Sequence, residues 1–172
     1  AVFAIVAETM RAARDALPLA KVEYETLPAI LTIDEAMKAG SWLGPSVTME
    51  SGSPDTALAG AQHTLSGRSE IGGQEHFYLE GQAALAIPGE DRDMTLHCST
   101  QHPSEIQHKV ADCLGLSNHD VTVETRRMGG AFGGKESQGN LPAILSALAA
   151  HVTGRPAKTC LLYTSDAADE LT

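Results

Sequence analysis

The stretch that decides the fold is Arg126-Arg-Met-Gly-Gly-Ala-Phe-Gly-Gly-Lys-Glu136, in which two Gly-Gly pairs enclose one aromatic residue. The residues before it, 121–125, alternate like a strand, and residues 141–152 after it have the spacing of a helix. A glycine-rich turn between a strand and a helix lets backbone N–H groups converge on an anion or an oxo group. Phe132 does not serve flexibility there, so we interpret it as a packing plug or as a wall of a site.

Taken by itself, this glycine turn leaves several functions open. The spacing Gly129-x4-Gly134-Lys135 fits the first seven positions of a phosphate-binding P-loop. The eighth position is Glu136, where that motif has a Ser or Thr whose hydroxyl holds Mg²⁺, and a carboxylate would oppose the phosphates. A further alternative is a non-catalytic α/β interaction module, in which the glycines only provide positive φ.

The remaining pattern predicts a mixed α/β (α+β) chain. We expect strands at 21–26, in several pieces between 57 and 87, and at 94–100. We expect helices at 8–17, at 34–38, at 104–114 and from Asn140 to a stop at Gly154. Residues 40–54 have the composition of a loop or linker. The order strand, helix, strand, glycine loop, helix from 93 to 152 indicates one compact α/β unit.

Composition narrows the class of protein. With 172 residues and 42% hydrophobic content the chain is large enough for a core, but only 4% is aromatic, so that core must be aliphatic. The formal charge of −10 argues against a nucleic-acid partner, and no apolar run approaches the roughly 20 residues of a membrane span. Three widely spaced cysteines give neither a disulfide framework nor a C-x-x-C metal site, which favours a reducing, cytoplasmic location.

Both ends of the chain have unusual sequences. The chain begins without Met, in what resembles the middle of a strand. From Cys160 onward the sequence resembles the translation of a transposase adapter used in sequencing libraries. We therefore expect residues 159–172 to be adapter-derived and disordered, and the chain to be a fragment of a larger protein.

Three motifs resemble the xanthine dehydrogenase / xanthine oxidase family of molybdenum hydroxylases. They are the glycine loop 126–136, the run Gly72-Gly-Gln-Glu-His-Phe-Tyr-Leu-Glu80 and the run Cys98-Ser-Thr-Gln-His-Pro-Ser-Glu105. The resemblance extends in order from about residue 1 through residue 158 without large gaps. The amino-acid sequence of these motifs is most similar to that of the separate molybdopterin-binding subunit of bacterial enzymes.

The resemblance implies a domain order and an activity. Residues 1–32 would end a small α/β-hammerhead-like domain, 33–56 would be a linker, and 57–158 would begin the molybdenum cofactor-binding domain. The implied activity is oxidation of a purine, xanthine or hypoxanthine, with water as the oxygen source. An aldehyde-oxidising relative is the alternative within the family.

The resemblance also implies cofactors and partners. The cofactor of this domain would be molybdenum–molybdopterin. The full complex would also carry [2Fe-2S] and FAD on other domains or subunits, because three scattered cysteines cannot ligate a cluster that needs four. The implied partner is an iron–sulfur/FAD subunit, in a dimer of heterodimers, with no nucleic-acid or membrane partner.

Single residues receive roles from the resemblance. Gln101 matches the glutamine whose side-chain amide hydrogen-bonds an oxygen ligand of molybdenum, as a neutral donor that adds no charge. Phe132 matches the residue that contacts the metal centre through its backbone. Three glycines would let this backbone come close to the cofactor: Gly130, Gly133 and Gly134. Because Gln101 and Phe132 are 31 positions apart, we expect the fold to bring them together.

Glu136 matches the glutamate that hydrogen-bonds the purine substrate. The related aldehyde oxidases typically have an apolar residue at this place, because an aldehyde has no N–H that could donate a hydrogen bond to a carboxylate. The general-base glutamate of the family would lie beyond the C-terminus, so no catalytic residue is expected in this chain. Three earlier acidic residues should not be assigned to that role: Glu75, Glu80 and Glu105. We expect His76 to be buried and hydrogen-bonded, and not a metal ligand.

Overall fold

The computed structural model describes residues 2–161, which fall into two units. The first unit comprises the described residues of Ala1–Leu17 and Gly73–Thr172, and the second comprises Pro18–Gly72. None of the helices within 2–161 is long and apolar enough to cross a membrane.

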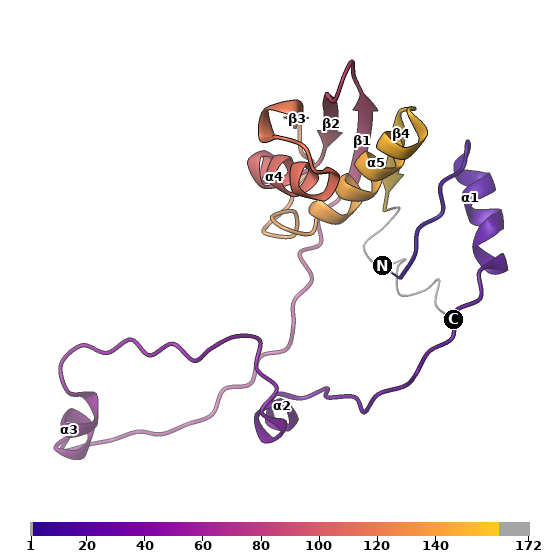
Figure 1. Ribbon diagram of the computed structural model, residues 1–172. Helices are drawn as coiled ribbons and strands as arrows, with labels where there is room; N and C mark the ends of the chain where they lie inside the picture. Colours follow the sequence, from indigo (N-terminus) through magenta and orange to yellow (C-terminus); the bar gives the residue numbers. More distant parts are fainter. Residues whose placement is uncertain (1, 162–172) are drawn as a thin grey trace. The chain divides into compact units, whose positions relative to one another are not determined.

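A four-stranded sheet forms the centre of the first unit, with the strand order β3-β2-β1-β4. Its strands are β1 (Ala83–Pro88), β2 (Met94–Cys98), β3 (Val121–Glu124) and β4 (Ala157–Cys160). β1 pairs antiparallel with both β2 and β4, whereas β2 and β3 are parallel. The parallel pair requires a crossover, which α4 (Pro103–Leu114) and the short 3-10 helix η2 (Asn118–Asp120) provide. Figure 1 shows α4 and α5 (Asn140–Thr153) together against the strands.

The core lies between the sheet and these two helices. Strand β2 buries every second residue, and α4 buries its apolar face, as amphipathic elements do. Helix α5 contributes small side chains, which let it lie close to the sheet. The fully buried aliphatic members are Ala86, Leu96, Ile106, Val110, Ala143 and Ala150. The core is aliphatic, as the low aromatic content predicts.

Glycines end both long helices of the first unit. Gly115 (φ 64°) follows α4 and Gly154 (φ 65°) follows α5, each in the left-handed conformation that glycine adopts without strain. The stop at Gly154 and the end of the other helix at residue 114 were predicted from the sequence. Gly139, and not Asn140, holds the N-cap position of α5, while the Asn140 side chain donates a hydrogen bond to Glu105 Oε1 at 2.7 Å.

The remaining helices are short and have no buried residues. Helix α1 (Met10–Ala16) continues into the 3-10 helix η1 (Leu17–Leu19). Helix α2 (Ile33–Ala39) begins with a complete capping box between Thr32 and Glu35, and α3 (Pro54–Ala59) begins with a proline in its first turn. No residue of Pro18–Gly72 is buried.

Several expectations about the first half of the chain are wrong. Within the described residues, 21–26 form no strand, because alternation makes a strand only where a partner strand is available. Between 57 and 82 the structure has the end of α3 and extended chain, and the first strand begins at Ala83. By contrast, the helix expected at 34–38 is present as α2. The expected domain limits, 1–32, 33–56 and 57–158, stay a prediction. The sheet-containing unit of this structure resumes at Gly73.

The expectation for the C-terminal segment is wrong at its first two residues. Thr159 and Cys160 belong to β4, where they pair with Ala84 and Ala83 of β1. Backbone pairing along an open sheet edge orders them. The rest of the expected adapter segment, from residue 162 on, lies outside the described residues.

Candidate functional site

The glycine loop between β3 and α5 has an unusual backbone at its centre. Gly130 and Gly133 both have φ 94°, and Phe132 between them has φ 50°. Positive φ is rare for a bulky residue and costs free energy, so the surrounding loop must impose it. Phe132 is 75% exposed, so this conformation does not serve to bury its side chain. No described residue accepts a hydrogen bond from the Phe132 N–H.

Gln101 lies directly against this loop, as predicted. Its side-chain Oε1 accepts hydrogen bonds from the backbone N–H of Gly133 (3.1 Å) and of Lys135 (3.2 Å). Its own backbone N–H donates to the Lys135 carbonyl at 3.0 Å. Because both backbone donors require an oxygen, the amide orientation is fixed, and the Nε2 donors point away from them. No described residue accepts a hydrogen bond from Nε2, so the side chain offers a free neutral donor beside the loop.

A buried lysine closes the loop against the sheet. The side chain of Lys135 is 0% exposed, and its Nζ donates to Glu80 Oε2 and to Ser99 Oγ, both at 2.8 Å. Nζ also lies 4.8 Å from the centre of the Tyr78 ring. A buried ammonium is tolerated because all of these groups compensate for lost hydration. This arrangement was not predicted from the sequence.

Glu80 is the carboxylate at the centre of this network. The hydrogen bond from Lys135 is the main reason why the pKa of Glu80 falls from 4.5 to about 2, with smaller contributions from the Gly129 N–H and the Ser99 hydroxyl. At neutral pH Glu80 is therefore ionised, and its Oε2 already accepts hydrogen bonds from Lys135, Gly129 and Ser99. Such a group is a poor proton acceptor, which agrees with excluding it as a general base.

Two glycines of the loop are required by close packing. A Cβ on Gly134 would lie 2.5 Å from Tyr78 Cε1 and 2.9 Å from His76 Cγ. A Cβ on Gly129 would lie 2.7 Å from the Cβ of Glu80. The chain segment before β1 therefore lies directly on the loop. The expectation that His76 is buried is wrong: its side chain is 37% exposed, because it covers the loop from the outside.

Glu136 follows the loop and points away from the core. Its side chain is 55% exposed, and its Oε1 lies 4.0 Å from Nε2 of His102, the residue after Gln101. His102 also lies 3.5 Å from Glu105. The fold therefore places Glu136 at the same end of the sheet as Gln101, with a carboxylate accessible to solvent. Whether it contacts a substrate stays a prediction.

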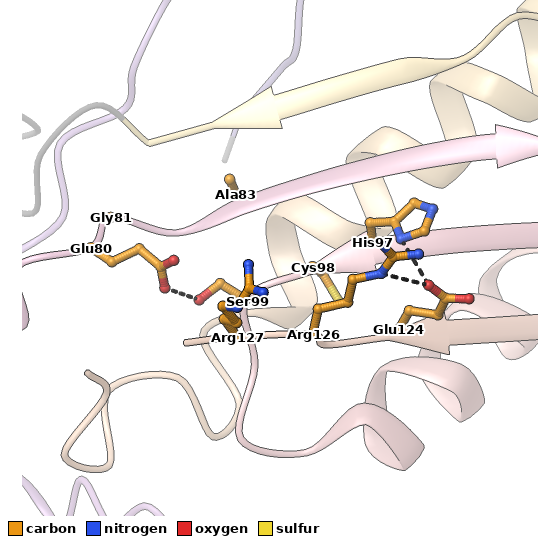
Figure 2. A pocket seen from close by; sticks show the side chains of 9 residues that line it. All are labelled: Glu80, Gly81, Ala83, His97, Cys98, Ser99, Glu124, Arg126 and Arg127. Atoms are coloured by element: carbon orange, nitrogen blue, oxygen red, sulfur yellow. Dashed lines mark hydrogen bonds and ion pairs between the residues drawn. The ribbon is translucent and has the colours of Figure 1, made fainter. Parts of the chain in front are cut away.

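A cavity of about 330 Å³, which was not predicted from the sequence, adjoins the buried network at Glu80 and Ser99. Figure 2 shows three of its lining residues side by side: the Glu124 carboxylate lies 3.3 Å from His97 Nδ1 and 3.6 Å from Arg126 Nε. Burial raises the pKa of Cys98, also in the lining, to about 11, so this thiol is not a nucleophile at neutral pH. Within residues 2–161, no group of His, Cys, Asp and Glu side chains has the arrangement of a metal site.

Comparison with known proteins identifies the family. The model of the molybdopterin cofactor-binding domain matches residues 40–169. The xanthine dehydrogenase/oxidase of Mus musculus is 44% identical over 160 residues, which cover 92% of this chain and 12% of that protein. The chain belongs to the molybdenum hydroxylase family. The resemblance predicted from the three motifs is confirmed.

The chain is also similar to an aldehyde oxidase and to a solved structure of an oxidoreductase. Aldehyde oxidase 4 of Cavia porcellus is 40% identical over 159 residues, covering 91% of this chain and 12% of that protein. The crystal structure of quinoline 2-oxidoreductase from Pseudomonas putida 86 superimposes with a TM-score of 0.74 at 24% identity, over 90% of this chain and 21% of that chain. The mixed α/β fold of a cofactor-binding domain is therefore confirmed. The chain spans only about an eighth of its sequence relatives.

Proposed function

We propose that the full-length protein is a molybdenum-dependent hydroxylase that oxidises a purine, xanthine or hypoxanthine, with water as the oxygen source. The observation that carries this proposal is the contact between Gln101 and the glycine loop. Two backbone N–H groups hold Oε1 of Gln101, so that its Nε2 is left as a donor next to the loop. Family membership supports the cofactor, and the geometry supports these residues as its contacts.

The residues present fit a molybdenum–molybdopterin group. An oxygen ligand of the metal is an acceptor, and the chain offers neutral donors, Gln101 Nε2 and the Phe132 N–H, that no described residue uses. Gly130 and Gly133 have no Cβ to block an approach to this backbone. When bound, the group would supply a redox centre that accepts two electrons from the substrate. Gln101 and Phe132 would orient and polarise its oxygen ligands without adding a charge.

Glu136 is proposed as the purine-binding residue. Its carboxylate is half-exposed, at the end of the loop that carries Phe132, and its nearest basic group is His102 at 4.0 Å. A carboxylate accepts a hydrogen bond from a purine N–H, and this bond strengthens as charge develops on the ring. Since an aldehyde oxidase is almost as similar to this chain as a xanthine dehydrogenase, overall identity does not decide between the substrates. An aldehyde-oxidising enzyme is therefore the second candidate.

A phosphate-binding function has little support in this loop. The lysine of a P-loop must reach the phosphates, but Lys135 is fully buried and already donates to Glu80 and Ser99. The P-loop alternative is thus opposed both by the carboxylate of Glu136 and by the direction of the Lys135 side chain. We further propose iron–sulfur and FAD groups on other parts of the complex, an assembly as a dimer of heterodimers, and a cytoplasmic location.

Substitution of Glu136 in the full-length enzyme tests the purine assignment. A hydrogen bond to a charged group contributes roughly 1.5–3 kcal/mol, so Glu136→Ala or Glu136→Val should lower kcat/KM for xanthine by about one to two orders of magnitude. Molybdenum content should stay near normal, and aldehyde turnover should fall less or rise. Glu90→Ala, which removes an exposed carboxylate from the turn between β1 and β2, is the matched control and should leave kcat/KM unchanged.

Two results would contradict this assignment. One is loss of molybdenum from the Glu136 variants while xanthine kinetics per molybdenum stay at the wild-type level, which would make Glu136 a structural residue. The other is an equal loss of activity toward xanthine and aldehydes, which would remove the reason for preferring a purine.

A further inference from the structure

We propose that Lys135 is a positioning residue, which joins both ends of the glycine loop to Glu80 and thereby aims the Gln101 side chain at the metal centre. The consequence for the metal centre rests on the proposed function. The connection between Lys135, Glu80 and the loop rests on the geometry alone.

The first step concerns the Glu80 carboxylate, which holds both ends of the loop. Its Oε2 accepts a hydrogen bond from the backbone N–H of Gly129 at 2.9 Å and one from Lys135 Nζ at 2.8 Å. Ser99 Oγ, at the end of β2, donates to the same oxygen at 2.7 Å. One oxygen atom therefore connects the start of the loop, its end and the sheet. Figure 2 shows the Glu80 side chain directed at Ser99.

The second step concerns the main chain of Lys135, which contacts Gln101 on two sides. Its N–H donates to Gln101 Oε1 at 3.2 Å, and its carbonyl accepts from the Gln101 N–H at 3.0 Å and from Thr100 Oγ1 at 3.3 Å. The side chain of Lys135 is thus anchored to the sheet, and its main chain holds Gln101. A change in the anchor moves the atoms that orient the carboxamide.

The third step separates positioning from packing. The Lys135 side chain is fully buried, so an apolar side chain of similar length would fill the same space. In this pair the lysine is buried and the carboxylate is partly exposed. Replacing a buried charge and its partner together by residues of similar volume is often neutral for stability, whereas removing one partner is costly. Packing therefore does not require the charges. The specific effect of the charges is that the Gly129 N–H, the Lys135 ammonium and the Ser99 hydroxyl all donate hydrogen bonds to one carboxylate oxygen.

Hydrogen–deuterium exchange of the full-length protein tests this proposal, in the metal-free and in the molybdenum-loaded form. The variants are Lys135→Met and the double variant Lys135→Met/Glu80→Gln, with Lys109→Met on the exposed side of α4 as the control. In both test variants, peptides covering 126–136 should exchange about ten- to a hundredfold faster than in the wild type, because hydrogen bonds to a charged group are lost. The double variant should regain the thermal stability that Lys135→Met loses, while its loop stays fast.

Wild-type exchange of this loop in the folded double variant would overturn the proposal and leave Lys135 as a packing residue. If neither Met variant accumulates as folded protein, Ser99→Ala is used instead, since it removes the two hydrogen bonds of Ser99 Oγ, to Glu80 and from Lys135, and keeps the ion pair. A severalfold faster loop then supports the proposal, and an unchanged loop refutes it. Molybdenum content reports separately on the proposed function: a loosened loop with molybdenum fully retained supports the role of Lys135 and contradicts the metal-site role of the loop.

Discussion

Residues 18–72 and residues 73–161 are held together in different ways. The first region has helices but no buried residue, and its best-defined feature is the local capping box between Thr32 and Glu35. In the second region, burial begins at Tyr78 and ends at Ala150, and all the residues of the candidate site lie within or beside this part. Local hydrogen bonds are enough to form a helix. A strained loop such as the one around Phe132 requires neighbours that are distant in sequence.

A matched pair of leucines gives the largest expected difference between the regions. Leu96 is 0% exposed in β2, whereas Leu65 is 101% exposed in the other region. Leu96→Ala should lower the free energy of unfolding by about 2–5 kcal/mol, because a core cavity remains, and Leu65→Ala should change it by less than about 0.5 kcal/mol. Urea denaturation of the purified 172-residue chain measures both. Equal effects would show that the two regions do not differ in packing.

A matched pair of glycines examines the loop itself. Gly134→Ala introduces a Cβ that meets Tyr78 and His76, and overpacking of this kind typically costs about 1–3 kcal/mol. Gly67→Ala meets no atom within 4 Å, so it should be neutral or slightly stabilising, since the unfolded chain loses conformational freedom. Thermal unfolding of the two variants compares them. A fully tolerated Gly134→Ala would contradict the close packing of the segment 76–80 on the loop.

The pH dependence of stability should reflect the ion pair in the second region. The pKa of Glu80 lies at about 2 in the folded chain against 4.5 ordinarily, so its contribution is complete above 4.5 and is lost as the pH falls toward 2. The loss should be less than about 1 kcal/mol, because the carboxylate is 42% exposed and water screens it. Denaturation midpoints of the wild type should fall more steeply across this window than those of Glu80→Gln. Parallel curves would contradict the pairing with Lys135.

The capping box of α2 gives the smallest expected effect on the whole chain. Thr32→Ala removes a cap worth about 0.5–2 kcal/mol to the helix, so α2 should lose helical content. The pKa of Glu35 is lowered mainly by the hydrogen bond from the Leu31 N–H and also by its hydrogen bonds with Thr32. Because nothing in α2 is buried, the unfolding midpoint of the sheet region should stay at its wild-type value. NMR chemical shifts of α2 and of β2 report the two effects, and a shifted β2 would show coupling between the regions.

The accuracy of the sequence predictions follows the same division. The helices ending at Gly115 and Gly154 were predicted close to their observed bounds, because their apolar faces are real core faces and their stops are glycines. The strand at 21–26 was wrong because alternation cannot show whether a partner strand exists. The same holds for the strands expected between 57 and 82.

The candidate site was predicted only in part, for a physical reason. The motifs led to Gln101 and the glycine loop, and their contact is confirmed. The burial of Lys135 was missed, because its partners Glu80 and Ser99 lie 55 and 36 positions away and no local pattern reports them. A lysine after two glycines has the same local sequence whether it points to a ligand or into the core.

A structure of the full-length enzyme with its cofactor bound tests the central claim most directly. We predict that Gln101 Nε2 and the Phe132 N–H each lie within roughly 2.7–3.2 Å of an oxygen ligand of molybdenum. Oε1 of Gln101 should still accept its two hydrogen bonds from Gly133 and Lys135. The account would be contradicted by a metal centre bound elsewhere, with Gln101 and Phe132 both beyond hydrogen-bond distance of its ligands.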